Sequence, residues 1–315
     1  MKILLFTHKN DIDGMGNAIL AKLTFDNVDY ILCETFDLQH KVNEFITTGK
    51  IYEYDKIYIT DLCLEEELLS LINKDEKLKN KIQIIDHHKT YEDEKYTKYP
   101  FVKVKLKNDK GLCCGTSLFY EYLINNNFLV ASDITNEFVE LTRLHDTWEW
   151  KNIYNNEKAR ELAILFDALG TEGYINFMYE KLNTEDEFNF NEIETILINN
   201  KKIVINDAIE GYLKQIYYRE ILGMKAAIIF INYEFRNEIA EYLRENNYDI
   251  DFVMMIALDR GVVSYRSVKE NVSVRKVAEY YNGKGHDAAA TNPITKEQKE
   301  MIVELLTKKK INLNN

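Results

Sequence analysis

Short apolar runs alternate with longer amphipathic stretches through the first hundred residues, and this alternation constrains the fold more than any other feature of the chain. Four runs have the length and composition of strands, residues 2–7, 29–33, 56–61 and 82–86, and three stretches between them have the period of helices, residues 15–24, 38–47 and 65–73. Strands that alternate with helices in this way form a mainly parallel sheet covered by helices. We therefore predict an α/β domain at the start of the chain.

The rest of the chain predicts a helical connector and a second, smaller α/β domain. Helical patterns cover residues 116–127, 134–146, 157–169 and the long stretch 192–223. A second strand and helix pattern follows, with strands at 226–231, 252–258 and 262–268 and helices at 236–246, 274–281 and 295–307, before a tail at 308–315 that we expect to fray. The predicted organisation is a first domain at 1–195, a connector at 196–223 and a C-terminal domain at 224–315.

The charge of the chain is unevenly distributed. The net charge is −12, but residues 1–223 carry 26 Lys and Arg against 39 Asp and Glu, whereas residues 224–315 carry 14 against 13. A strongly acidic domain disfavours a scaffold that coats long nucleic acid, because such affinity comes mainly from Lys and Arg. It does not exclude a metal site, which needs an excess of carboxylates.

Cysteine usage and the N-terminal residues indicate a cytoplasmic protein. The four cysteines, Cys33, Cys63, Cys113 and Cys114, form no C-x-x-C pair, so we expect reduced, buried thiols. The first apolar run turns polar at His8 and is too short for a signal peptide or a membrane span. We expect no membrane partner, and the sequence leaves the oligomeric state open, a homodimer included.

Acidic and histidine residues gather where the predicted strands end. They are His8, Asp11 and Asp13 after the first strand, Asp61 at the end of the third, Asp86, His87 and His88 at the end of the fourth, and the later pair His145 and Asp146. In an open parallel sheet the carboxyl ends of the strands share one edge, and ligands bind there. These side chains are therefore expected to surround one point.

A cluster of carboxylates is stable only when it holds protons or divalent cations. A single Asp at a strand end is most often a helix N-cap, and Asp-x-Asp-Gly alone resembles half of a calcium loop, but the remaining calcium ligands are missing. Three acidic segments in this order favour a metal site. Oxygen and imidazole ligands without thiolate suit manganese, magnesium or iron, and two ions could share the site and clamp a phosphoryl group.

These motifs resemble those of the DHH phosphoesterase superfamily. Residues 11–14 (Asp-Ile-Asp-Gly), 60–62 (Thr-Asp-Leu) and 86–88 (Asp-His-His) are similar to its first three motifs, and Asp146 lies where the family has its fourth aspartate. The C-terminal residues 263–267 (Val-Ser-Tyr-Arg-Ser) and 283–290 (Gly-Lys-Gly-His-Asp-Ala-Ala-Ala) resemble the DHH-associated domain of that family. The resemblance spans nearly the whole chain.

The resemblance implies a role for each residue of the acidic cluster. Asp11 and Asp61 would hold one metal ion, and Asp13, Asp61, His87 and Asp146 the other, with Asp61 as the bridge. His88 would face the substrate, and Asp86 would orient a histidine. His8 is also a metal-ligand candidate, although only two residues separate it from Asp11 where several family members have three. His145 is expected to pack within its helix or to support the ligands.

In the C-terminal domain the resemblance implies a grip on phosphate. Ser264, Arg266, Gly283, Lys284, Gly285 and His286 are the predicted substrate-binding residues. A guanidinium binds phosphate with two parallel hydrogen bonds, and glycines let backbone amides approach it. Lys284 replaces the middle glycine of the family loop, which either adds a phosphate contact or hinders close backbone approach. Arg275 and Lys276 lie on the helix beside this loop.

The resulting hypothesis is a manganese-dependent phosphodiesterase that trims short single-stranded oligonucleotides to mononucleotides. Family members of this length resemble nanoRNases, and cyclic-dinucleotide or phosphoadenosine-phosphate phosphohydrolases are alternative activities. A pyrophosphatase is disfavoured, because that branch has a different C-terminal domain. A catalytically inactive nucleotide-binding regulator is the alternative outside the enzymes.

Overall fold

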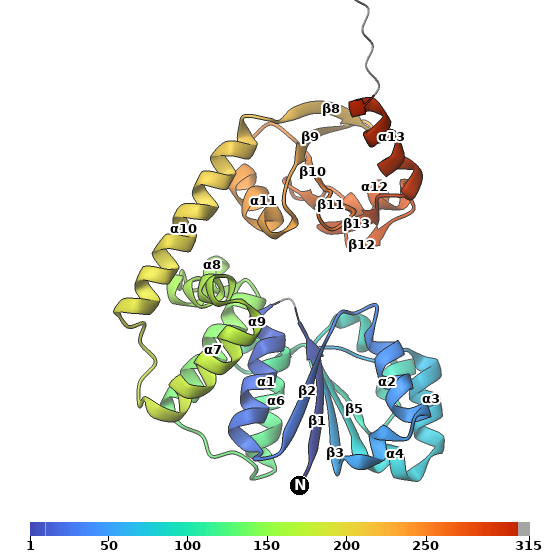
Figure 1. Cartoon of the computed structure of the whole chain (residues 1–315), viewed down its shortest axis with the longest axis vertical. Helices are drawn as coiled ribbons and strands as arrows, with labels where there is room; N and C mark the ends of the chain where they lie inside the picture. The colour runs from blue at the N-terminus through green and yellow to red at the C-terminus, as the bar shows by residue number, and fades with distance from the viewer. Residues whose placement is uncertain (10, 308–315) are drawn as a thin grey trace, which may run out of the picture. The chain divides into compact units, whose positions relative to one another are not determined.

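The computed structural model describes residues 1–9 and 11–307, which fall into two compact units (Figure 1). The units are Met1–Lys201 and Lys202–Asn315, and the division lies inside the helix α10 (Glu192–Leu213). The predicted domain limits at 195/196 and 223/224 stay predictions. The tail expected to fray, residues 308–315, lies outside the described residues.

A five-stranded parallel sheet forms the centre of the first unit, in the order β2-β1-β3-β4-β5. Its strands are β1 (Ile3–His8), β2 (Val28–Cys33), β3 (Lys56–Thr60), β4 (Ile82–Asp86) and β5 (Val102–Val104). The four strands expected from the sequence are all present, and β5 adds an edge that the sequence pattern did not reveal. The predicted parallel α/β architecture is confirmed.

Helices cover both faces of this sheet (Figure 1). Side chains alternate along β1, so that Ile3 and Leu5 pack against one set of helices and Leu4 and Phe6 against the other. The first set is α1 (Ile12–Thr24), α6 (Gly115–Asn125), α7 (Asp133–Asp146) and α9 (Glu157–Thr184). The second set is α2 (Leu38–Thr47), α3 (Glu66–Lys74) and α4 (Glu76–Lys81).

Short elements complete the first unit. They are the 3-10 helices η1 (Lys50–Glu53) and η2 (Lys89–Tyr91), the helices α5 (Glu94–Thr97) and α8 (Glu149–Asn152), and the hairpin β6 (Lys107–Asn108) and β7 (Gly111–Leu112). The helix predicted at 157–169 is the first part of the longer α9, which continues past a non-helical Gly170 with φ 68°.

The second unit is built on a mixed six-stranded sheet in the order β12-β13-β11-β10-β9-β8. Its strands are β8 (Tyr217–Ile221), β9 (Met224–Phe230), β10 (Phe252–Ala257), β11 (Val262–Ser267), β12 (Lys284–Gly285) and β13 (Ala289–Pro293). Its helices are η3 (Tyr233–Phe235), α11 (Arg236–Glu245), α12 (Val274–Tyr280) and α13 (Lys296–Thr307). The C-terminal half of α10 and α11 pack on one face of the sheet, and α12 packs on the other.

The prediction of a continuous helix through residue 223 was wrong beyond Leu213. The chain instead forms β8, which pairs antiparallel with β9 through a turn at Leu222 and Gly223, both with positive φ. Most of β8 is exposed, so its strand conformation comes from pairing with β9 and not from an apolar pattern of its own. Within the described residues, every helix is too short or too polar to cross a bilayer.

Candidate functional site

The acidic and histidine residues expected to converge do so at the carboxyl edge of the parallel sheet. Asp61 directly follows β3, Asp86 ends β4, and Asp11 is the N-cap of α1, in the connection that follows β1. Asp146 is the last residue of α7. Three groups offer ligand atoms that lie within 4.8 Å of one another. They are His8, Asp11 and Asp61; Asp13, His87 and Asp146; and Asp61, Asp86, His87 and His88.

Asp61 connects the first two groups. Its Oδ1 lies 3.1 Å from His87 Nε2, and its Oδ2 lies 3.8 Å from His8 Nδ1. His87 Nε2 is also 3.7 Å from Asp13 Oδ2 and 3.8 Å from Asp146 Oδ2. The two oxygens of one carboxylate therefore face two separate sets of potential ligands.

The electrostatics of this cluster favour a cation. Burial, and after it the charges of Asp13 and Asp11, raises the pKa of Asp61 well above its usual range. Burial and then Asp13 also raise the pKa of Asp146 well above its usual range. Asp61 Oδ2 and Asp86 Oδ2 are buried and have no hydrogen-bond partner among the described residues. Crowded, buried carboxylate oxygens without hydrogen-bond donors are the environment that a divalent metal ion stabilises, so the residues of the cluster fit such an ion.

Asp11 has two roles in the structure. Its Oδ1 accepts a hydrogen bond from the Gly14 amide at 2.9 Å, as an N-cap does, and its Oδ2 lies 2.6 Å from His8 Nδ1. Burial lowers the pKa of His8, but Asp11, followed by Glu34 and Asp13, more than offsets this, so the pKa of His8 is raised. The N-cap and ligand interpretations of Asp11 are therefore compatible. Since α1 begins at Ile12, before the predicted helix at 15–24, the Asp-Ile-Asp-Gly motif forms the start of the helix.

Backbone donors from a distant helix hold Asp13, a feature that the sequence analysis missed. The amides of Gly115 and Thr116, in the first turn of α6, donate to the two carboxylate oxygens at 2.7 Å each. The Thr116 hydroxyl also donates to the Asp13 carbonyl at 2.6 Å. A Cβ at position 115 would lie 2.6 Å from the Asp61 Cβ, so this approach requires glycine. A Gly-Thr pair opening a helix beside the acidic edge is the signal that could have identified these residues.

The Asp-His-His motif places its two histidines in different environments. Asp86 is fully buried, and its Oδ1 accepts from the His87 amide at 2.7 Å and lies 2.8 Å from His88 Nδ1. Burial lowers the pKa of His88, but Asp86, followed by Asp13 and Asp11, more than offsets this and the pKa is raised. Burial lowers the pKa of His87. The His88 side chain is 49% exposed, so it is the histidine that an incoming molecule can reach.

His145 lies beside Asp146 but outside the three ligand groups found among the described residues. Burial lowers the pKa of His145 to about 4, which keeps its imidazole neutral. The packing or supporting role expected of His145 from the sequence stays a prediction.

The predicted phosphate-binding residues of the second unit lie on different elements. Ser264 and Arg266 project from β11 on the face covered by α11, and Arg266 Nη1 donates to the Ser264 hydroxyl at 2.9 Å. Gly283, Lys284, Gly285 and His286 lie at and beside β12, the edge strand. Among the described residues, no hydrogen bond or ion pair joins His286 to Arg266 or Ser264. Ser264 and Arg266 of the strand motif therefore contact each other, whereas the loop motif at residues 283–286 makes no such contact with them.

The glycines of the loop have a packing role of their own. A Cβ at Gly283 would lie 2.3 Å from the Thr291 carbonyl oxygen, and a Cβ at Gly285 would lie 2.4 Å from the Ala290 Cα. Gly285 also has φ 151°. Close approach of β12 to β13 thus requires both glycines, whatever they contact in a substrate. Lys284 and His286 are exposed between and beside them.

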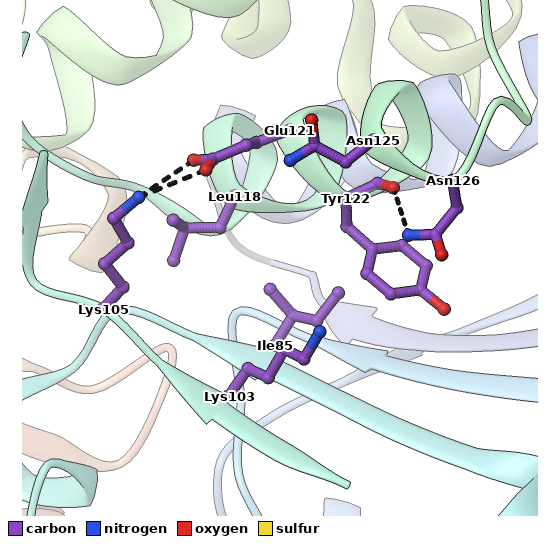
Figure 2. A pocket seen from close by; sticks show the side chains of 8 residues that line it. All are labelled: Ile85, Lys103, Lys105, Leu118, Glu121, Tyr122, Asn125 and Asn126. Carbon is purple, nitrogen blue, oxygen red and sulfur yellow. Dashed lines mark hydrogen bonds and ion pairs between the residues drawn. The ribbon is translucent and has the colours of Figure 1, made fainter.

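A separate hollow of about 150 Å³ lies on the first unit, between the edge of the sheet and α6 (Figure 2). Ile85 and Leu118 line it together with Tyr122, and Lys103 reaches over the ring of Tyr122 at 5.4 Å. Lys105 at its rim pairs with Glu121 at 3.2 Å. None of the acidic cluster residues lines this hollow, so it is distinct from the candidate metal centre.

Comparison with known proteins agrees with these features. Residues 2–144 match the family model described as the DHH family, N-terminal domain. The chain is 32% identical over 305 residues to the oligoribonuclease NrnB of Bacillus subtilis, which covers 95% of this chain and 74% of the relative.

Two solved structures share the fold along nearly the whole chain. A pGpG-specific phosphodiesterase, PggH from Vibrio cholerae, has a TM-score of 0.56 at 13% identity, with 97% of each chain covered. The exonuclease RecJ bound to manganese has a TM-score of 0.54 at 16% identity, with 96% of this chain and 88% of that chain covered. At these identities the likeness shows the fold.

Proposed function

The chain belongs to the DHH family of phosphoesterases, and on that premise we propose that it hydrolyses short oligonucleotides to mononucleotides with divalent metal at the acidic cluster. The observation that carries the chemistry is Asp61, whose two oxygens face two sets of ligands. In this proposal Asp11, Asp61 and His8 hold one ion, and Asp13, Asp61, His87 and Asp146 hold the other.

Manganese is the metal we propose. The donors are carboxylates and imidazoles without thiolate, a set that suits manganese, magnesium and iron. The RecJ structure that shares the fold is bound to manganese. Divalent ions at such a site supply Lewis-acid stabilisation of phosphoryl oxygens and lower the pKa of water for attack on phosphorus.

His88 is the proposed proton donor to the leaving oxygen. Because Asp86 lies against Nδ1, the Nε2 atom of the exposed ring is the one that remains for the substrate. The raised pKa of His88 favours the protonated ring, the form that a general acid requires. Asp86 is then a positioning residue that fixes the orientation of the imidazole.

The substrate class rests on the relatives and on charge. NrnB is named an oligoribonuclease and PggH a phosphodiesterase specific for pGpG, so both names refer to nucleotide substrates. The strongly acidic first unit repels a long polyanion, which favours short substrates. Ser264, Arg266, Gly283, Lys284, Gly285 and His286 of the second unit are the proposed substrate-binding residues.

Hydrolysis of a labelled panel tests the proposal. The panel contains dinucleotides, longer oligomers, a cyclic dinucleotide, phosphoadenosine phosphate and pyrophosphate, each with and without manganese. We expect mononucleotide release from short linear RNA, dependent on manganese, lost in Asp86→Ala and retained in Asp109→Asn, a substitution at an exposed acid outside the cluster. If folded protein with bound metal releases no mononucleotide from any oligonucleotide, the proposal is contradicted. Hydrolysis of only the cyclic dinucleotide, phosphoadenosine phosphate or pyrophosphate would assign that compound as the substrate instead.

A further inference from the structure

Arg266 is a half-buried cation whose partners are all neutral. Its Nη1 donates to the Ser264 hydroxyl at 2.9 Å and to the Tyr265 carbonyl at 3.0 Å. Its Nε and Nη2 donate to Asn237 Oδ1 at 3.3 and 3.2 Å. These contacts fix the plane of the guanidinium without neutralising its charge.

A second guanidinium lies beside it. Arg236 begins α11 and precedes Asn237, the residue that accepts from Arg266. Its guanidinium lies 4.1 Å from the centre of the Tyr233 ring, and its Nη1 donates to the Tyr233 carbonyl at 3.2 Å. Its Nε is buried and has no acceptor in the described part of the chain. An arginine is therefore held in place with one donor unsatisfied, which points to a missing acceptor.

The two cations act on each other. Burial, and after it the charge of Arg236, lowers the pKa of Arg266 to about 10. In residues 1–9 and 11–307, neither guanidinium forms an ion pair with a carboxylate, although the protein carries 52 acidic residues. Two adjacent positive charges without a counter-ion cost free energy unless a bound anion compensates them. We call Arg236 and Arg266 the arginine pair.

We propose that the arginine pair clamps the terminal phosphomonoester of the substrate, which rests on the proposed function. A phosphomonoester carries about −1.5 to −2 charges at pH 7, whereas an internal diester carries one, so the two guanidiniums match the terminal group. Planar guanidiniums also suit the geometry of phosphate oxygens. Arg236 adds a second guanidinium to the phosphate contact expected at Arg266. With two positive charges at one point, the protein should prefer a substrate that ends in a phosphomonoester.

The test compares one dinucleotide in three forms, with a 5′-phosphate, with a 3′-phosphate and with neither. It uses the full chain with manganese, as wild type, Arg236→Gln, Arg236→Lys and the control Arg244→Gln. Arg244 lies on the same helix and donates to a single carbonyl, that of Ser267, at 2.9 Å. Thermal unfolding of each variant separates loss of the clamp from loss of the fold.

We expect the wild type to favour one phosphorylated form, and Arg236→Gln to reduce that preference, measured as a ratio of kcat/KM values, by about 10- to 100-fold. Arg236→Lys should reduce it less, and Arg244→Gln should keep it. Equal hydrolysis of all three forms by wild type, or an equal loss on all three in folded Arg236→Gln, would overturn the clamp and leave the proposed function standing.

Binding separates the clamp from catalysis. In the Asp61→Asn variant, titration with adenosine monophosphate and with adenosine should show tighter binding of the monophosphate, by about tenfold or more, lost when Arg236→Gln is added. Inorganic phosphate in the same titration distinguishes a free anion from a nucleotide end. If no form is hydrolysed but this difference appears, the proposed function fails and the clamp holds; if the difference is missing, the clamp fails.

Discussion

The acidic cluster of the first unit and the arginine pair of the second carry opposite charges. Among the described residues, only histidines pair with the cluster, and no carboxylate pairs with the arginines. In the cluster, burial and crowding raise the pKa of Asp61 and Asp146, and two carboxylate oxygens lack donors among the described residues. In the arginine pair, the guanidiniums contact neutral acceptors. This difference is the basis of our two proposals, that the cluster of the first unit binds divalent cations and that the arginine pair of the second binds an anion.

The largest expected effect is on the cluster. Asp61→Asn should lower kcat by about 10³-fold or more, because the carboxylate that faces both ligand sets is lost. The metal-free variant should unfold at the same temperature as wild type or higher, because a crowded buried carboxylate has been removed. Steady-state kinetics measures kcat and thermal unfolding measures the stability, with Asp109→Asn as the control variant. A large loss of metal-free stability together with residual activity would assign Asp61 to the fold.

A smaller effect is expected at the arginine pair. Arg266→Gln should raise KM by about 10- to 100-fold, because the grip on phosphate weakens, and should lower kcat less. Manganese binding to the first unit should stay within about twofold of wild type. Isothermal titration with manganese and steady-state kinetics test the separation. A parallel loss of manganese affinity would show that the two charged regions are not independent.

The loop glycines should affect stability more than chemistry. Gly285→Ala should reduce the free energy of unfolding by about 2 kcal/mol or more, because its Cβ would meet the Ala290 Cα at 2.4 Å in a left-handed backbone. Gly211→Ala is the matched control, since its Cβ would meet nothing within 4 Å inside α10 and alanine favours a helix. Denaturant unfolding gives both values. An unchanged free energy of unfolding together with lost phosphate binding would show that Gly285 serves substrate binding and not the packing of β12 on β13.

Manganese affinity and anion affinity should also depend differently on pH, with a change of up to about tenfold per pH unit for each group that titrates. Below their raised pKa values Asp61 and Asp146 carry protons that a metal ion must displace, so manganese affinity should fall as pH falls and level off above those values. The arginine pair stays charged until pH approaches 10, the pKa of Arg266, so anion binding should weaken above about pH 9. It should also weaken below about pH 6, where the phosphate itself gains a proton. Titrations from pH 5 to 10 with manganese and adenosine monophosphate record both curves. Manganese affinity independent of pH would contradict the raised carboxyl pKa values.

The strand ends were predictable from the sequence because the signal is local. Each apolar run of β1, β3 and β4 stops directly before its acidic motif, and parallel strands must present those ends at one edge. The alternation along β11 similarly placed Ser264 and Arg266 on one face. These features need no knowledge of distant residues.

Contacts between distant residues were not predictable. Thr116 holds Asp13 from 103 positions away, and β8 is an exposed strand that exists because β9 pairs with it. Arg236 has no motif around it, and only the packing of α11 on β11 brings it beside Arg266. Small residues in β13 likewise gave no strand signal until the sheet placed them next to β11.

The position of bound manganese tests the central claim most directly. Anomalous diffraction from crystals grown with manganese should show two ions. One should be contacted by His8, Asp11 and Asp61, and the other by Asp13, Asp61, His87 and Asp146, so that Asp61 contacts both. Manganese bound elsewhere with the cluster empty, or a single ion that Asp61 does not contact, would contradict the account.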